Sequence, residues 1–355
     1  MSTPLTFTIS EGFEDDSDSA LQYGAFSRDW ADEEALDELM DKLETGAISV
    51  KQALLHAQKL LAKSPDNLEL QNYLANRMWD LEMRDEAAEV WSKGFTQASK
   101  LIPKGFKGLI PWLETDNRSF LRLCHGHLLG LMHQLDGKAA QLLAKKMLAW
   151  NPNDNTGVRM LLGDISLMQG DTKAALKSFL KEADSSPAHW YQAGQIAFRD
   201  GDYVSACTYI RRGIAANSYI AEGLTGRTVL TEHLYWHASS IYGPEWAADY
   251  LNAAQSKGIC EWTPEEVDFA DWVFNTAEVL KERAKVTALH EGLTYARAPK
   301  ERQLYAHKSS LFLDTVTDTL SKKLVRKIHN RYDIEIWPWE RAGFINATPR
   351  PASAP

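Results

Sequence analysis

The sequence predicts an all-α fold of helix hairpins stacked side by side, and two regular spacings carry this prediction. Ala53, Ala140 and Ala175 are each followed by a proline twelve residues later. A small residue lets two helices cross closely, and a proline ends a helix where the next hairpin must begin. The second spacing is thirty-one residues, and it relates Gly163, Gly170, Ala175 and Phe179 to Gly194, Gly201, Ala206 and Ile210.

A period in the low thirties, built of a helix, a short Gly-Asp turn and a second helix, is typical of a tetratricopeptide-like array. One hairpin is too small to bury its own apolar face, so stacked neighbours share a continuous core. We therefore expect residues 46–221 to form a tetratricopeptide-like solenoid, a right-handed superhelix of helix hairpins.

Composition limits the class of protein. Of the 355 residues, 44% are hydrophobic and 25% are charged, which is ordinary for a soluble protein with a sizeable core. No apolar run reaches the ~20 residues that span a bilayer, and the first residues lack the pattern of a secretory signal. Cys124, Cys207 and Cys260 are far apart, so we expect buried, reduced thiols rather than disulfides or a zinc site. These features predict a cytoplasmic protein without membrane contact.

The negative charge is concentrated at the start of the chain. Between Met1 and Thr45 there are thirteen acidic residues against Arg28 and Lys42, while the net charge of the whole chain is −9. Such a like-charged stretch buries too little apolar surface to offset its ordering entropy. We therefore expect residues 1–45 to form an acidic, largely disordered arm with a possible capping helix after Trp30. The rest of the chain has no basic stripe, so no nucleic-acid partner is expected.

Apolar spacing and turn residues place the elements in order. Within the repeats, helices are expected at 49–62, 68–79, 86–98, 120–134, 138–150, 156–169, 172–183, 190–199 and 203–216, with a loop at 102–108. Residues 222–335 are expected to form a helical extension, with helices at 228–242, 246–255, 264–295 and 301–330. Residues 336–355 form an apolar-aromatic segment and a tail rich in Pro and Ala. Trp337 and Trp339 are expected to pack into a groove of the chain itself, since two exposed tryptophans would be a liability.

Three stretches in the middle of the chain match motifs of a known group of proteins. They are Pro111-Trp112-Leu113-Glu114, Asn117-Arg118-Ser119-Phe120-Leu121-Arg122 and Asn151-Pro152-Asn153-Asp154-Asn155-Thr156-Gly157-Val158-Arg159. Together they resemble a group of bacterial tetratricopeptide proteins related to the suppressor-of-tumorigenicity-7 family, over residues 110–273. Ser119 stands where that group usually has proline, and Thr156 where it has glutamine. The resemblance implies a helical-repeat fold and a bacterial source, and it implies no defined biochemical activity.

The last of these stretches also has a physical interpretation. Asn151 is expected to end a helix in a left-handed turn, and Asp154 or Asn155 to cap the next helix through a side-chain oxygen. Gly157 is expected to allow close packing, and Arg159 to bind a nearby carbonyl or carboxylate. This interpretation predicts a structural role for the stretch and no ligand.

Two pairs of histidines suggest chemistry at first sight. His125 and His127 lie about 200° apart on a helix, so they cannot share a metal ion. His233 and His237 share a helical face, but Leu234 stands where a zinc hydrolase needs glutamate. The sequence also has no phosphate-binding loop and no nucleophile elbow. We therefore expect no enzyme, metal or cofactor, and the alternative is an enzyme with an unrecognised site near His233 and His237.

In tetratricopeptide arrays the first helix of each hairpin lines a concave groove, where a partner's peptide or helix can bind. The expected function is a non-catalytic adaptor or scaffold for another protein, whose identity and oligomeric state the sequence leaves open. If the groove is filled by the chain's own C-terminal segment, the alternative is a regulatory subunit that acts through its acidic arm or convex face. The repeat register places these residues in the groove: Asn72, Asn76, Trp79, Arg122, His125, Met132, His133, Met160, Asp164, Tyr191, Gln195, Phe198 and Arg199.

Overall fold

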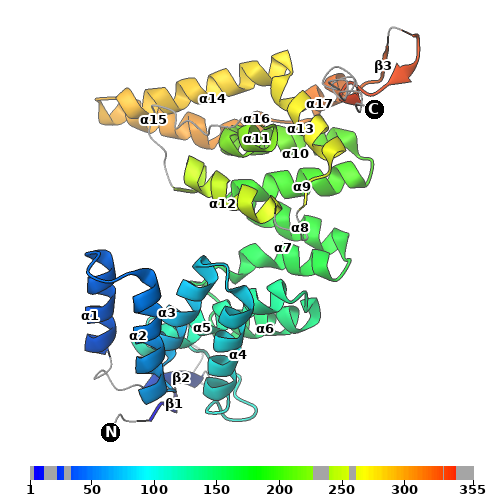
Figure 1. Ribbon diagram of the computed structural model, residues 1–355. Helices are drawn as coiled ribbons and strands as arrows, with labels where there is room; N and C mark the ends of the chain where they lie inside the picture. Colours follow the sequence, from blue (N-terminus) through cyan, green and yellow to red (C-terminus); the bar gives the residue numbers. More distant parts are fainter. Residues whose placement is uncertain are drawn as a thin grey trace, which may run out of the picture. The chain divides into compact units, whose positions relative to one another are not determined.

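The computed structural model describes residues 4–11, 22–27, 33–226, 240–255, 261–330 and 332–340. In these ranges the chain is mostly helical, as an all-α fold requires, and its strands form two short antiparallel pairs (Figure 1). The chain divides after Gly170 into two compact units. Unit 1 comprises residues 1–170 and unit 2 comprises residues 171–355. None of the described helices is both long and apolar enough to cross a membrane.

Unit 1 is a series of helices in which each packs against the next along the chain. The small residues predicted at the crossings, Ala53 and Ala140, are fully buried. Gly126 serves the same purpose, because a Cβ atom there would lie 2.3 Å from the Trp91 ring. The helices are α1 (Glu33–Glu44), α2 (Val50–Lys63), α3 (Leu68–Asp80), α4 (Arg84–Ser99), α5 (Thr115–His133), α6 (Gly137–Trp150) and α7 (Val158–Met168).

Side-chain caps explain where three of these helices begin. Ser49 and Gln52 form a reciprocal capping box at the start of α2, and Asn67 caps α3. Asp136 caps α6 through its carboxylate. Because each cap satisfies backbone N–H groups that a first helical turn leaves unpaired, the helix starts are fixed by local sequence.

The turn between α6 and α7 confirms part of the interpretation and corrects the rest. Asp154 caps α7 by accepting from the N–H groups of Val158 and Arg159, both at 2.8 Å. The Arg159 guanidinium donates to the Pro152 carbonyl, as expected. Asn151 is not left-handed, with φ −133°; the left-handed residues are Asp154 and Gly157, with φ 53° and 77°. Gly157 is needed for this φ and not for close packing, since a Cβ there would meet no atom within 4 Å.

The prediction of a largely disordered arm is wrong for the described part of residues 1–45. Strands β1 (Thr6–Glu11) and β2 (Gln22–Ser27) pair antiparallel, and α1 supplies the expected helix. The Phe26 ring lies 4.4 Å from that of Phe120, and the Phe26 N–H donates to Asn117 Oδ1 at 2.9 Å. The physical reason is that each strand carries a phenylalanine that the helical core can bury, whereas the acidic run 14–18 lies outside the described residues.

Unit 2 continues the helical pattern and adds a C-terminal section. Helices α14 and α15 lie side by side at one end of the unit (Figure 1). The helices are α8 (Thr172–Glu182), α9 (Pro187–Arg199), α10 (Tyr203–Ala216), α11 (Ser218–Leu224), α12 (Pro244–Gln255), α13 (Pro264–Asn275), α14 (Ala277–Tyr295), α15 (Pro299–Ser310), α16 (Phe312–Thr315) and α17 (Asp318–Leu324), with a 3-10 turn η2 (Ser240–Tyr242) and strands β3 (Ile328–His329) and β4 (Glu335–Ile336).

Two long helices predicted in the C-terminal section are divided. The expected helix 264–295 breaks at Thr276, whose extended backbone (ψ 135°) ends α13 and begins α14. The expected helix 301–330 becomes α15, α16, α17 and β3, because Thr317 is extended as well. These breaks let the shorter helices pack against α10, which straight helices could not all reach. Most of the expected helix 228–242 lies outside the described residues.

A buried ion pair ties the C-terminal section to α10. Arg211 is 2% exposed. Its guanidinium binds the Glu282 carboxylate on α14, with Nε donating at 3.0 Å. It also donates to the Thr317 carbonyl and to the Ser321 hydroxyl at the start of α17. All three nitrogens of this guanidinium therefore donate to groups of the chain itself, which is how a buried charge is tolerated.

Candidate functional site

The groove residues predicted in unit 1 lie on three helices, α3, α5 and α7. Asn72 is buried and its Nδ2 donates to the Ser119 carbonyl at 2.8 Å, so it joins α3 to α5. The others retain contact with solvent: Asn76, Trp79, Arg122, His125, Met132, His133, Met160 and Asp164.

The C-terminal ends of α3 and α5 bring several of these side chains together. The Trp79 ring lies 5.7 Å from the His133 ring and 5.5 Å from the Arg84 guanidinium. His133 Nε2 lies 3.2 Å from a carboxylate oxygen of Asp85. We call Trp79, Arg84, Asp85 and His133 the Trp79 patch. It combines a half-buried indole with both signs of charge at the surface of unit 1.

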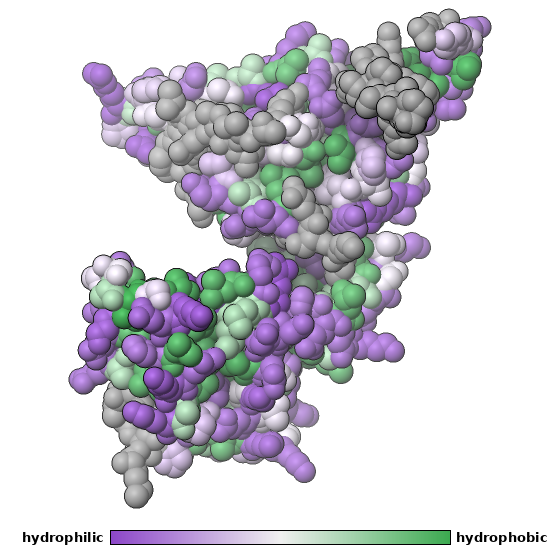
Figure 2. All heavy atoms as spheres, viewed as in Figure 1, coloured by the Kyte–Doolittle hydropathy of each residue, from purple (hydrophilic) through white to green (hydrophobic). Residues whose placement is uncertain are grey.

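A second aromatic-cationic group in unit 1 surrounds Trp112. The guanidinium groups of Arg118 and Arg122 lie 5.6 and 5.5 Å from its ring. Arg122 also pairs with Glu69 at 3.2 Å, and Glu69 accepts from the Ser119 hydroxyl. Sequence reasoning found Arg122 but missed Trp112 and Arg118, although the i,i+4 spacing of the two arginines on one helix face was a signal. Figure 2 shows apolar and hydrophilic side chains interleaved over α2 and α3 of the same unit.

The four groove residues predicted in unit 2 contact other parts of the same chain, and three of them, Gln195, Phe198 and Arg199, contact its C-terminal section. Tyr191 is fully buried, and its hydroxyl donates to the Asn217 carbonyl at 2.7 Å. Gln195 Nε2 donates to the Glu266 carboxylate of α13 at 2.9 Å, and Arg199 pairs with the same carboxylate. The Phe198 ring lies 4.9 Å from the Phe269 ring on α13 and 6.2 Å from the Trp339 ring. Trp339 also contacts the rings of Tyr203, Phe269, Trp272 and Trp337.

Four of the described histidines and cysteines, His125, His127, Cys124 and Cys207, are buried or half-buried among the helices. Burial lowers the pKa of His125, which the nearby Asp154 carboxylate partly offsets, and burial also lowers the pKa of His127. Burial raises the pKa of the Cys124 thiol, and it raises that of the Cys207 thiol to about 11. Among the described residues, no group of three or more His, Cys, Asp or Glu could hold a metal ion. His233 and His237 lie outside the described residues.

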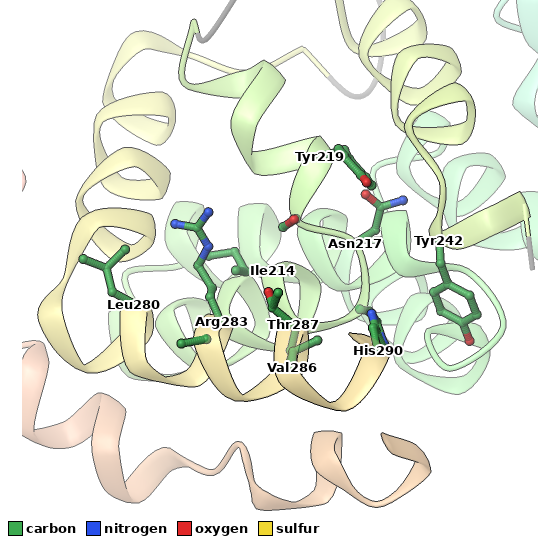
Figure 3. Close-up of a pocket in the computed structure, with 13 residues that line it drawn as sticks. Ile214, Asn217, Tyr219, Tyr242, Leu280, Arg283, Val286, Thr287 and His290 are labelled. Carbon is green, nitrogen blue, oxygen red and sulfur yellow. The ribbon is translucent and has the colours of Figure 1, made fainter. Parts of the chain in front are cut away.

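Sequence reasoning missed two separate cavities in unit 2. The first lies between the end of α10, the start of α11 and α14 (Figure 3). It has a volume of about 260 Å³ and reaches Asn217, Arg283 and Thr287. The second, of about 520 Å³, reaches Leu293 and the helices α15 and α16. Both cavities are lined by Ala215, Ala216, Tyr242, Val286 and His290.

In comparisons with known proteins, no family model and no curated sequence matches the chain. The resemblance to bacterial tetratricopeptide proteins therefore stays a prediction, which rests on the motifs in residues 110–159.

Proposed function

We propose that the protein is a tetratricopeptide-like adaptor that binds a peptide or helix of another protein on unit 1. The observation that supports this proposal is the Trp79 patch. Tryptophan and arginine are the residues that contribute most to binding free energy at protein interfaces. Here a half-buried tryptophan lies between an arginine and a histidine at the ends of two packed helices.

The proposal assigns the partner to unit 1 because the equivalent residues of unit 2 are already bound. A partner that contacted Gln195 and Arg199 would first have to displace Glu266 of α13. That displacement would remove the hydrogen bonds that Gln195 and Arg199 donate to a carboxylate that is 2% exposed, which is costly. In unit 1 the residues Asn76, Trp79 and Arg122 keep solvent contact, and the Glu69 carboxylate that pairs with Arg122 is itself partly exposed.

The experiment is capture of partners by the tagged full chain from its native cells, with quantitative mass spectrometry. The test variants are Trp79→Ala and Arg122→Ala. The control is Leu142→Ala on α6, whose side chain is 69% exposed and lies outside the Trp79 patch. A hot-spot residue contributes about 2 kcal/mol or more, so Trp79→Ala should lower the affinity at least tenfold.

The proposal requires a stoichiometric partner that binds the unchanged chain and the Leu142→Ala variant but not the Trp79→Ala variant. Circular dichroism must show that all variants keep their helix content. A partner that binds Trp79→Ala and Arg122→Ala as well as the unchanged chain would exclude this surface.

A further inference from the structure

Strand β1 leaves one edge of its sheet open. On the far side of β2, the Gly24 N–H donates to the Leu109 carbonyl at 2.7 Å, and the Leu109 N–H donates to the Gln22 carbonyl at 2.8 Å. Both edges of β2 are therefore paired, whereas no described segment pairs with the outer edge of β1. Figure 1 shows β1 at the border of unit 1, close to the start of the chain.

The register fixes which residues of β1 face outward. Neighbouring residues of a strand direct their N–H and C=O groups to opposite sides. Since the even-numbered residues of β2 face Leu109, its odd-numbered residues face β1, where they pair with even-numbered residues. The odd-numbered residues of β1, which are Phe7, Ile9 and Glu11, therefore direct their backbone groups away from β2. No hydrogen bond joins these groups to any residue that the structure describes.

Contacts with the helices hold β1 in its extended conformation. The Leu5 N–H donates to Asp66 Oδ2 at 2.9 Å, and Leu5 is 9% exposed. The Phe7 ring lies 4.9 Å from the Phe26 ring and 5.5 Å from the Phe106 ring. Because β1 is already ordered, little of the entropy cost of pairing with another strand falls on it.

The outer edge of β1 lacks the features that usually protect an edge strand, which are lysine, proline and bulges. The strand Thr6–Glu11 contains neither lysine nor proline, and its six residues pair one to one with β2. Five of the six residues are exposed, with Ile9 at 40%. An ordered and exposed edge of this kind suits the addition of a further strand.

Charge decides which kind of strand suits this edge. Residues 1–27 contain five acidic side chains and no lysine or arginine. Glu11 ends β1 and is exposed, and the other four acidic side chains follow it in the sequence within residues 14–18. A basic strand is attracted to these charges, whereas a second copy of this chain would bring five more acidic side chains and be repelled.

We propose that β1 binds an extended, basic segment of another protein, which adds to the sheet as an antiparallel strand. Antiparallel pairing is slightly more stable per residue than parallel pairing. An apolar residue of the partner lies opposite Ile9, and a lysine or arginine two positions earlier in the partner lies opposite Glu11. This edge shares no residue with the Trp79 patch.

The probe is the peptide Lys-Arg-Lys-Thr-Val-Thr-Val-Thr with both ends blocked, titrated into the full chain at low salt by calorimetry. Its second lysine is designed to lie opposite Glu11, and its two valines opposite Ile9 and Phe7. The peptide should bind with a Kd below about 1 mM. A peptide with glutamate in place of the three basic residues should bind at least about tenfold more weakly.

Two N-methylated forms of the basic peptide test the backbone hydrogen bonds. Methyl groups on both valine nitrogens remove donors that face β1 and should lower the affinity at least about tenfold. Methyl groups on the nitrogens of the first two threonines lie on the side away from β1 and should leave the affinity unchanged.

Variants of the chain test the same edge. Ile9→Pro removes an outward N–H, which an edge strand tolerates, and should lower the affinity about fivefold or more. Thr8→Val is the matched control, because Thr8 directs its backbone groups towards β2, and it should bind the peptide normally. If circular dichroism shows that Ile9→Pro disturbs the fold, the two N-methylated peptides decide.

Four results would overturn the proposal. The basic peptide could fail to bind the unchanged chain, or the acidic peptide could bind as tightly. The two N-methylated peptides could bind equally well. Finally, sedimentation could show a dimer that Ile9→Pro dissociates, which would assign the edge to a second copy of the chain.

Discussion

Helix α3 of unit 1 and helix α9 of unit 2 begin equivalent hairpins, yet they differ in what covers them. In α9 every residue from Pro187 to Ala197 is buried, because α8 and α10 pack against this helix and Gln195 contacts α13. In α3, Asn76 is exposed and Trp79 is only half-buried. The comparison shows that the first helix of a hairpin can have its polar side open to solvent or buried by the same chain.

The polar side of α9 is accommodated by a single carboxylate. Glu266 accepts from Gln195 and Arg199, and it also accepts from the Thr263 N–H as part of the capping box of α13. The Glu266 carboxylate therefore caps the start of α13 and also pairs with side chains of α9. This double use explains how Gln195 and Arg199 are paired where α13 covers the C-terminal end of α9.

The largest expected effect comes from detaching the C-terminal section of unit 2. Arg211→Ala removes one partner of a buried ion pair and should lower the free energy of unfolding by about 3–5 kcal/mol. Arg212→Ala is the matched control, because the neighbouring half-buried arginine makes one hydrogen bond to the Val316 carbonyl and should contribute about 1 kcal/mol. Urea unfolding, followed by labelling of the buried Cys207 thiol in a Cys260→Ser background, measures both.

Equal effects of the two arginine substitutions would mean that the ion pair does not hold the C-terminal section on α10. The covering of α9 would then depend on its aromatic contacts alone.

A smaller effect is expected for the exposed side of unit 1. Trp79→Ala should lower the stability of unit 1 by about 1–2 kcal/mol, because its ring is half-buried. Trp339→Ala in unit 2 removes a ring that is 4% exposed and should lower stability by about 3–5 kcal/mol. Urea unfolding followed by thiol labelling separates the two units, with Cys124 reporting on unit 1 and Cys207 on unit 2. If the two substitutions lowered stability equally, the contrast between the covered and the exposed helix would be lost.

The smallest effect is a pH dependence that belongs to unit 1. Burial lowers the pKa of His125 and His127 below the ordinary value of 6.5, so the folded unit holds both rings neutral. The unfolded chain binds protons as the pH falls through 6.5, and the folded unit does so only at lower pH. Stability is therefore complete above pH 6.5 and is lost as the pH falls towards the lowered pKa values.

Thermal unfolding at pH 7.5 and pH 5.5 tests this dependence. The melting temperature should fall by about 2–4 °C at the lower pH, and the double substitution His125→Gln, His127→Gln should reduce the fall. His133→Gln, in the exposed Trp79 patch, is the control and should leave the fall unchanged. A fall that the double substitution does not alter would assign the pH dependence to other groups.

The sequence predicted helices of both units wherever the residues that determine them lie close together in the chain. The alanines at the crossings, the cap Asp154 and the Gly-Asp turns all act within one or two helical turns, so their spacing is visible in the sequence. The same periodicity could not show that Thr276 and Thr317 break the longer C-terminal helices, since threonine is tolerated inside a helix.

The sequence by itself determined the helical hairpins, their order and the starts of most helices. Only the tertiary structure decided which helix sides are covered, where the strand pair of the N-terminal arm lies and that a cavity forms beside Asn217. The physical reason is sequence separation. Arg199 binds Glu266, which is 67 positions away, and the Phe26 N–H binds Asn117, which is 91 positions away. Neither contact produces a periodic pattern in the sequence.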